Sequence, residues 1–438
     1  MHIRLNPLSA TKPTVLVETE CRIIPMLINT ITRPINFTMI LCMLGILFLD
    51  MRLDRRSRPP SLNEKKWIVV TRSSSADNLN RLALAYPDWM IVVVSNAHHS
   101  SHSKRIVHLT AADRAKLRVS TGDGYAFTPQ QQRNLGYLYA IANGAEWIYD
   151  LTIDSTPYGK GLEQFELKGN ASGIRFQAPE GESVEPRDRL FNPYSFHGRA
   201  DLSYPALVHL NVSHPDRMFR LCKRNARASV QYSLLESDAD HNSPYGTERT
   251  KSGTGFNRYS PAVTLAPGTF VPWHTLNALY HRSAFFTMFM PNLKTMQSSN
   301  IHRSLVAQKM LHMLGLTVAV VPPNARRSEK ENLDELNASK MEKLLEEVIN
   351  WECTSSKLQF CMYKLTREFA RHGFWTIEDA NQVPQWLEDL ESVGYKFPTP
   401  IENYDDDYRI MDDNQRLDNN CRKMSLALMS DMPARGQP

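Results

Sequence analysis

Two aspartates, Asp150 and Asp154, bracket the point at which an apolar strand gives way to a polar loop in AEWIYDLTIDSTPYGKGLEQF, residues 145–165. Carboxylate oxygens at such a point can hold Mn²⁺ or Mg²⁺ against the diphosphate of a nucleotide. Residues four positions apart in a straight strand lie about 13 Å apart, so both reach one ion only if the chain turns between them. The same aspartates could instead cap backbone amides at a strand end and a turn, and the local sequence leaves both interpretations open.

Arg133 and Asn134 open a helical stretch before this strand. A guanidinium matches the geometry of a diphosphate, and the start of a helix favours anions, but a solvated arginine is the simpler reading of this stretch. Two further polar clusters, AHHSSHSKRIVH (residues 97–108) and the D-x-D match in YDDDYRIMDD (residues 404–413), are interpreted as solvated segments. The chain contains no GxSxG, P-loop or kinase signature.

The elements that would position these residues alternate between strand and helix. Trp67–Thr71 and Trp89–Ser95 are continuously apolar and predict strands buried on both faces, with a helix around Leu79–Ala83 between them. Pro129 predicts the first turn of a helix that ends near Asn143, and a third strand begins at Trp147. This alternation predicts a parallel, doubly wound sheet, in which ligands bind beyond the carboxyl ends of the strands.

The first 64 residues predict a membrane attachment. The apolar run INFTMILCMLGILFL lies within residues 35–51, which we interpret as a transmembrane signal anchor between a tail (1–34) and a stem (52–64). The run is shorter than the roughly 20 residues of a typical span, so a signal-peptide core or a buried helix is also compatible with it. Basic residues cluster just after the run, and this charge distribution by itself favours a cytoplasmic C-terminal part.

Composition and cysteine usage narrow the class of protein. The chain has 438 residues, 42% of them hydrophobic, and a net charge of +5, which indicates an ordinary globular protein and no nucleic-acid partner. Cys222, Cys353, Cys361 and Cys421 form an even set compatible with lumenal disulfides. Three sequons permit N-glycosylation, at Asn170, Asn211 and Asn337.

From RNLGYLYAIANGAEWIYD (residues 133–150) onward the sequence resembles the STELLO-type family of glycosyltransferases, which are Golgi type II membrane proteins. The likeness continues through PYGKGLEQF, FNPYSFHG, APGTFVPWHTLNALYHRSAFF, NIHRSLVAQKMLHMLGLTVAVVPP and WLEDLESVGYKFP, and it covers roughly residues 65–397. The resemblance implies a GT-A-like, Rossmann-like, mostly parallel sheet with helices on both faces. It also implies a lumenal catalytic part and possible association with glycan-synthesis proteins.

The resemblance also assigns candidate site residues. The family's acidic motif has the form D-x-D-D-D-N, of which Asp150 and Asp154 are kept as metal ligands for Mn²⁺ or Mg²⁺, while Thr152, Ile153 and Ser155 replace the rest. Asp154 and the degraded position Asn300, in NIHR where the family has D-I-W-R, are the catalytic candidates. Five residues are the donor-binding candidates: Thr71, Arg133, Asn134, Asn277 and Arg303.

These observations predict a glycosyltransferase-like domain over residues 65–330, a helical region over 331–400 and a polar acidic tail over 401–438. The function expected from the resemblance is a membrane-anchored transferase that moves a sugar from a nucleotide-sugar donor to a glycan or protein acceptor. Because an asparagine cannot act as a general base and Thr152 offers only a neutral oxygen, a catalytically impaired lumenal binding or scaffolding subunit is the alternative.

Overall fold

A sheet of twelve strands organises the part of the chain that the computed structural model describes. All of the described residues fall in the unit Pro60–Pro438. They are residues 65–71, 76–95, 103–110, 113, 117, 119–120, 128–152, 155–157, 161–165, 171–199, 218–224, 228–237, 256–257, 260–273, 277–293, 296–327, 338–398 and 421–423. The predicted anchor at 35–51, Asp154 and the sequons at Asn170, Asn211 and Asn337 lie outside the described residues.

The first four strands form the parallel part of the sheet. β1 (Lys66–Thr71) lies between β2 (Met90–Val94) and β4 (Trp147–Thr152), and β3 (Ile106–Leu109) pairs with β2, all in parallel. The predicted strands and the alternation of strand and helix are confirmed here. Val, Ile and Trp fill these strands on both faces, as expected for a sheet covered by helices on both sides.

The second half of the sheet mixes directions. β10 (Asn277–His281) is antiparallel to both β4 and β8 (Val230–Ser237), and β11 (Val318–Arg327) runs parallel to β8. The full order is β12-β7-β6-β9-β11-β8-β10-β4-β1-β2-β3, with β5 paired to β11. The remaining strands are β5 (Ser155–Pro157), β6 (Ala171–Phe176), β7 (Phe219–Arg224), β9 (Val263–Leu265) and β12 (Cys421–Lys423). This mixed α/β architecture fits a GT-A-like fold.

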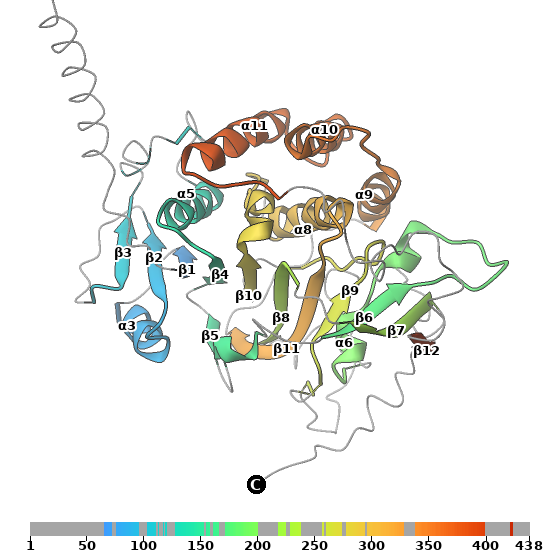
Figure 1. Ribbon diagram of the computed structural model, residues 1–438, viewed down its shortest axis with the longest axis horizontal. Helices are drawn as coiled ribbons and strands as arrows, with labels where there is room; N and C mark the ends of the chain where they lie inside the picture. The colour runs from blue at the N-terminus through green and yellow to red at the C-terminus, as the bar shows by residue number, and fades with distance from the viewer. Residues whose placement is uncertain are drawn as a thin grey trace, which may run out of the picture. The chain divides into compact units, whose positions relative to one another are not determined.

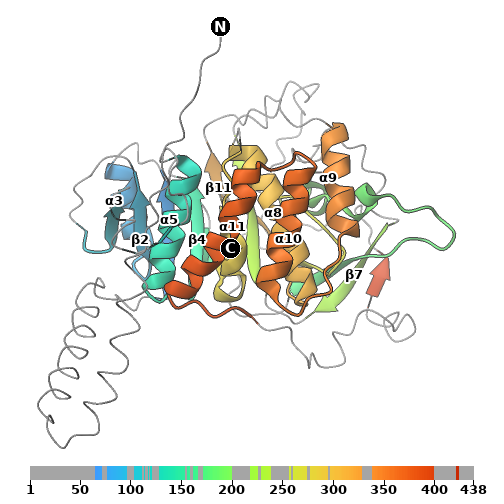
Figure 2. The same ribbon diagram turned by 90° about the horizontal axis from the view of Figure 1, so that it is seen from above.

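Helices cover the two faces of the sheet unequally (Figure 1). α3 (Ala76–Ala85) lies on one face, and α5 (Pro129–Ala142) and α8 (Met296–Met313) lie on the other. α10 (Leu358–Arg371) and α11 (Ile377–Ser392) form a second layer over α5 and α8, as the view from above shows (Figure 2). α9 (Ala338–Asn350) packs beside α8. The shorter elements are η1 (Gly161–Gln164), η2 (Pro186–Arg189), α6 (Pro193–Phe196) and η5 (Arg282–Met288).

Because successive side chains of a strand lie on opposite faces of the sheet, the protein has two hydrophobic cores, one on each face. Trp67, Val69 and Val92 belong to the large core beneath α5, α8, α10 and α11. Ile68, Val70 and Val93 belong to the smaller core beneath α3. α5 begins at the N-cap Thr128, whose side chain forms a capping box with Gln131, and Pro129 occupies its first turn as predicted.

α5 packs against β1 at close range because residue 136 is a glycine. A Cβ atom at Gly136 would lie 2.7 Å from Cγ1 of Val69 and 3.1 Å from Cγ2 of Val94. Any larger residue would push the helix away from the sheet. The side chains of the first two turns of α5 are consequently held against the strands, and this contact fixes where Arg133 and Tyr137 lie.

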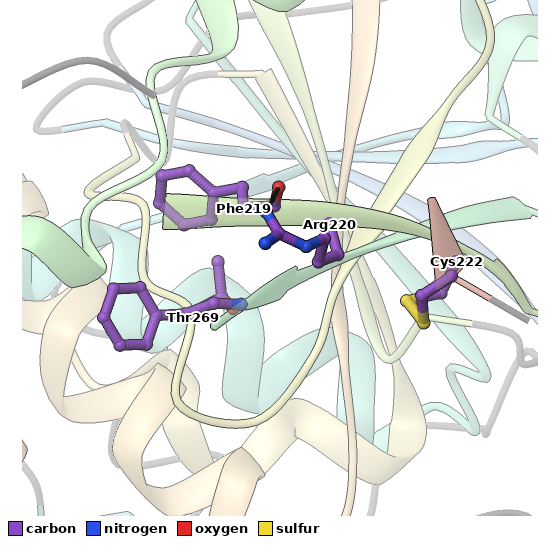
Figure 3. The surroundings of a disulfide bond; sticks show 6 residues. Phe219, Arg220, Cys222 and Thr269 are labelled. Atoms are coloured by element: carbon purple, nitrogen blue, oxygen red, sulfur yellow. Dashed lines mark hydrogen bonds between the residues drawn. A yellow bond between two sulfur atoms is a disulfide. The ribbon is translucent and has the colours of Figure 1, made fainter. Parts of the chain in front are cut away.

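Both disulfides of the described region join cysteines that the sequence analysis grouped. Cys353 pairs with Cys361 across 8 residues, and Cys222 on β7 pairs with Cys421 on β12 across 199 residues. Figure 3 shows Cys222 toward one end of β7 and Phe219 toward the other. Nothing in the pattern of residues 401–438 predicts a strand there, yet β12 extends the sheet at the β7 edge.

Across the described residues, no helix combines the length and the apolar character needed to cross a bilayer.

Candidate functional site at the strand tips

The carboxyl ends of β1 and β4 lie side by side at one edge of the sheet. Thr71, the last residue of β1, pairs in register with Thr152, the last residue of β4. Asn277, the first residue of the antiparallel strand β10, pairs with Leu151. Two of the predicted donor-binding residues, Thr71 and Asn277, are therefore brought next to the end of β4. Both are buried, with Thr71 5% exposed and Asn277 fully buried.

A chain of side-chain hydrogen bonds ties these tips to the loop that follows β5. The Tyr149 hydroxyl donates to Oδ1 of Asn277. Nδ2 of Asn277 donates to Oδ1 of Asn324 at 2.8 Å, and Nδ2 of Asn324 donates to the carbonyl of Gly161 at 2.9 Å. Burial raises the pKa of Tyr149 well above its ordinary value, so its hydroxyl stays protonated and available as a donor.

Gly161 begins η1 in a conformation that favours glycine. Its φ is +51°, and a Cβ atom there would lie 2.2 Å from the hydroxyl oxygen of Tyr86. The backbone of the loop can approach Tyr86 only because no side chain intervenes. Asn324, which holds the Gly161 carbonyl, was not among the predicted site residues. The pair Pro322-Pro323, which interrupts the strand pattern just before it, was the available signal of an irregularity.

Asp150 belongs to a different environment, on the α5 side of β4. Its side chain is fully buried. Nη1 of Arg133 donates to Oδ1 of Asp150, and the Tyr137 hydroxyl donates to Oδ2. Nη2 of Arg303, on α8, lies 3.9 Å from Oδ2. One carboxylate thus joins β4, α5 and α8 through two buried guanidinium groups.

Tyrosine hydroxyls and a carbonyl surround Arg303 in the same cluster. Nη2 of Arg303 donates to the Tyr280 hydroxyl at 2.7 Å, and Nη1 donates to the carbonyl of Met288 at 3.0 Å. Burial by itself lowers the pKa of Arg303, but the neighbouring Tyr280, Tyr137 and Asp150 outweigh it and raise the pKa above its ordinary value. Burial raises the pKa of Tyr137 and Tyr280, so both hydroxyls remain neutral. Arg303 is therefore held in its charged form.

Comparison with known proteins shows which family the chain is similar to. The sequence profile of a family described as "STELLO glycosyltransferases" matches residues 297–435, from the start of α8 to beyond β12. Two relatives from Arabidopsis thaliana, "Probable glycosyltransferase STELLO2" and "Probable glycosyltransferase STELLO1", are each 26% identical to the chain, over 359 and 367 residues. Each match covers 79% of this chain and 47% of the relative.

These matches make the chain similar to the STELLO family and support a divergent member of it. It spans about half the length of the curated relatives that it matches. The profile match includes β12, so the STELLO likeness reaches further toward the C-terminus than residue 397, where the quoted motifs end.

The STELLO acidic motif does not supply a metal site among the described residues. A divalent ion needs carboxylate oxygens that can approach it to about 2.1 Å. Both oxygens of Asp150 already accept hydrogen bonds, and the carboxylate is fully buried between the sheet and two arginines. The predicted role of Asp150 as a metal ligand does not fit this geometry. The candidate Asp154 lies outside the described residues, so its role stays a prediction.

The remaining predicted residues are buried inside the fold. Arg133 and Arg303 are each 2% exposed, and both pair with Asp150. Such buried, paired guanidinium groups do not fit donor binding. Asn134 is buried and exchanges two hydrogen bonds with the backbone of Met290, at 2.8 Å and 3.1 Å. Asn300, at the STELLO position of an acid, is fully buried in α8.

One group of potential metal ligands does occur among the described residues, on α9 and α10. Ligand atoms of Glu347, Glu368 and His372 lie within 4.8 Å of one another. Nδ1 of His372 lies 3.3 Å from Glu347, and Arg371 lies 2.6 Å from Glu368. Ordinary ion pairing accounts for this arrangement, and none of these residues was predicted as a ligand.

Two buried histidines are neutral in the fold. Burial lowers the pKa of His197 to about 3, and Nδ1 of His197 bonds to the Ser260 hydroxyl. Burial, together with nearby Lys340, lowers the pKa of His302 to about 4, and Nδ1 of His302 lies 3.1 Å from the carbonyl of Phe374. His302 thereby connects α8 to the turn before α11.

Proposed function

We propose that this protein is a glycosyltransferase that moves a sugar from a nucleotide-sugar donor to a glycan or protein acceptor. The observation that carries the proposal is the position of YDLT (residues 149–152), the first part of the STELLO-like acidic motif, at the end of β4 beside the end of the parallel strand β1. Ligands of open α/β sheets bind beyond such tips. The names of the relatives, both of which are called glycosyltransferases, support the same class of reaction.

In this proposal the chain's own residues position the donor. Thr71 and the end of β4 form the floor of the site, and the Tyr149–Asn277–Asn324 hydrogen bonds fix the loop beginning at Gly161 beside it. Asp154 remains the candidate ligand for Mn²⁺ or Mg²⁺, which would stabilise charge on the departing diphosphate. Asp150 does not share that role, because it is committed to Arg133 and Tyr137.

A second candidate function is a STELLO-related binding or scaffolding subunit without turnover, which could associate with other glycan-synthesis proteins. The burial of Asp150 and the asparagine at position 300 favour it. Asn300 cannot ionise to act as a general base, and Asp154 would be left as the nearest acid of the motif. Both functions keep the nucleotide site and differ only in catalysis.

We propose a lumenal location, in a Golgi or other secretory-pathway membrane, with a single-pass type II anchor at residues 35–51. The two disulfides support it, since disulfides persist in oxidising compartments and are rare in the cytosol. Modification of Asn170, Asn211 or Asn337, detected as a mobility shift after glycosidase treatment, would be the direct test. Unmodified sequons together with reduced cysteines in cells would contradict the location.

Donor hydrolysis by the purified full chain tests the enzymatic proposal. A panel of nucleotide sugars is incubated with and without Mn²⁺, and release of the nucleoside diphosphate is measured. Loss of turnover in Asp154→Ala, with an unchanged melting temperature, is the result expected of an enzyme. Tight nucleotide binding with no turnover of any donor, in the presence of candidate acceptors, would establish the binding subunit instead.

A further inference from the structure

The outer surfaces of α10 and α11 carry charges of opposite sign. α10 exposes four of its side chains, none of them acidic: Phe360, Lys364, Arg367 and Arg371. Their spacing of three and four residues places them in one row along the outward side of the helix, which we name the basic ridge. Nζ of Lys364 lies 4.9 Å from the centre of the Phe360 ring. Glu368, the one acid of α10, is less exposed, and its Oε2 lies 2.6 Å from Nη2 of Arg371. The ridge therefore keeps a net positive charge.

α11 presents the opposite charge at a similar spacing. Its sequence contains no lysine or arginine. Seven of its side chains are exposed: Ile377, Glu378, Asn381, Gln385, Glu388, Glu391 and Ser392. We name these seven residues the acidic ridge, since three are glutamates and none is basic. The apolar sides of both helices, with Leu365 and Trp386 fully buried, belong to the large core, so each helix offers only its ridge to a partner.

The two ridges lie side by side and antiparallel. Nε2 of Gln359, near the start of α10, donates to Oε1 of Glu391, near the end of α11, at 3.2 Å. Nη1 of Arg367 donates to Oδ1 of Asn381 at 3.3 Å. Figure 2 shows the two helices next to each other in the outer layer. These contacts fix the register of one ridge against the other.

This register sets which charges stand at the same height along the helices. A helix rises about 1.5 Å per residue, so counting from the second of these contacts places Arg371 nearly level with Glu378. Counting from either contact places Lys364 within about one turn of Glu388. Opposite charges on the two ridges are therefore matched in height.

A partner for this surface must complement both ridges at once. The axes of packed helices lie about 8–10 Å apart, and charges at that separation are still felt at physiological salt. An anionic polymer or an anionic membrane attracted to the basic ridge would be repelled by the acidic ridge beside it. A bilayer also requires an apolar helix face, and the apolar faces of α10 and α11 are buried in the core.

A second copy of the chain meets this requirement by symmetry. A twofold axis parallel to the two helices, lying between them in the plane of the outer surface, sets each basic ridge on the acidic ridge of the other copy and leaves all heights unchanged. An axis across the helices would set like charges on like. Phe360 and Ile377, each 46% exposed, belong to the two ridges and would be partly covered in such a pair.

We propose that the protein forms a twofold-symmetric dimer in which the basic ridge of each copy binds the acidic ridge of the other. This inference goes beyond the proposed function and does not depend on it, because none of the candidate site residues lies on α10 or α11. The helices are only about 21 and 24 Å long, and exposed ion pairs contribute little each. A weak, salt-sensitive dimer with a dissociation constant in the micromolar range is therefore expected.

Sedimentation velocity of the full chain in detergent tests the inference, at about 1 to 100 μM protein and at low and high salt. We expect a dimer that weakens as salt rises. Lys364→Glu or Glu388→Lys by itself turns two attractive contacts per dimer into two repulsive ones and should raise the dissociation constant about tenfold. A mixture of these two variants should dimerise within about threefold of the wild type, because the mixed pair holds one native contact and one with its charges exchanged.

Arg81→Glu is the matched control. Arg81 is also an exposed basic residue on a helix, but α3 lies on the opposite face of the sheet (Figure 1), so its reversal should leave the dissociation constant within about twofold. Melting temperatures check that every variant folds, and the proposed anchor at residues 35–51 is common to all of them.

A wild type that stays monomeric at every concentration would overturn the inference. So would a dimer that ignores the charges at positions 364 and 388, or two folded variants that fail to dimerise when mixed. An equal loss in Arg81→Glu would likewise overturn it, since general repulsion would then account for the effect. Each of these results leaves the proposed function standing.

Discussion

Replacing Asp150 with asparagine separates a structural carboxylate from a metal ligand. The substitution keeps the size of the side chain and removes the only carboxylate that contacts Arg133 and Arg303 within the described residues. Two buried guanidinium groups are then left without a counter-ion. The loss of a partner from a buried ion pair costs about 3–5 kcal/mol, because the remaining charge stays desolvated.

The geometry gives a similar magnitude. Arg303 lies 3.9 Å from Asp150, and two unit charges at that distance attract by about 4 kcal/mol at an effective dielectric constant near 20. The closer pair with Arg133 and the hydrogen bond from Tyr137 add to this, while side-chain relaxation reduces it. A loss of about 3–5 kcal/mol is a large share of the ~5–15 kcal/mol by which a typical domain is stable.

Urea unfolding of the full chain in EDTA is the assay. We expect Asp150→Asn to lower the unfolding midpoint sharply, and Asp88→Asn, at an exposed aspartate in the turn before β2, to change stability by less than about 0.5 kcal/mol. Adding Arg133→Gln to Asp150→Asn should restore part of the loss by removing one unpaired charge. A variant as stable as the wild type in EDTA, but with weakened Mn²⁺ binding, would refute the structural role and reinstate Asp150 as a metal ligand.

Three other perturbations follow from the structure. Replacing both Cys222 and Cys421 with serine removes the disulfide that closes 199 residues and should lower the free energy of unfolding by about 5 kcal/mol. Removing the Cys353–Cys361 disulfide, which closes 8 residues, should lower it by about 2.5 kcal/mol. Melting temperatures compare the two variants, and equal losses would contradict the loop argument. Since the pKa values of His197 and His302 are lowered to about 3 and about 4, the unfolded chain binds more protons below pH 6.5. Stability should then fall by about 2 kcal/mol per histidine between pH 7.5 and 5, and His302→Gln should flatten the profile measured by urea unfolding. Gly161→Ala should lower the melting temperature, because its Cβ would lie 2.2 Å from a tyrosine hydroxyl oxygen; an unchanged value would show that the loop is free to move.

The parallel part of the fold was predictable from local sequence. Runs such as Trp67–Thr71 are too continuously apolar for a strand with a solvated face, and Pro129 marks the start of a helix directly. The antiparallel strand β10 and the strand β12 were not predictable in the same way. Their positions depend on partners far along the chain, and three residues such as Cys421–Lys423 carry no periodicity.

The residues of the candidate site likewise differ in whether the local sequence could predict their surroundings. Thr71 and Asn277 were predicted as donor-binding residues, and both lie at the end of β4, although the antiparallel strand that carries Asn277 was not predicted. Whether a carboxylate is a ligand or a counter-ion depends on what packs against it from other elements. Arg303 reaches Asp150 from α8, more than a hundred residues later in the chain, and no spacing rule for the acidic motif contains that contact.

Alternation along β4 explains why a retained aspartate is weak evidence for catalysis in this chain. Tyr149 and Leu151 belong to the core beneath α3, and Asp150 belongs to the opposite face with Arg133. An aspartate at this position is needed to neutralise two arginines that hold α5 and α8 to the sheet, whether or not a sugar is transferred. Selection for the fold alone would keep it. The chemistry of the nucleotide site must therefore be decided by the residues that follow the strand, from position 152 onward.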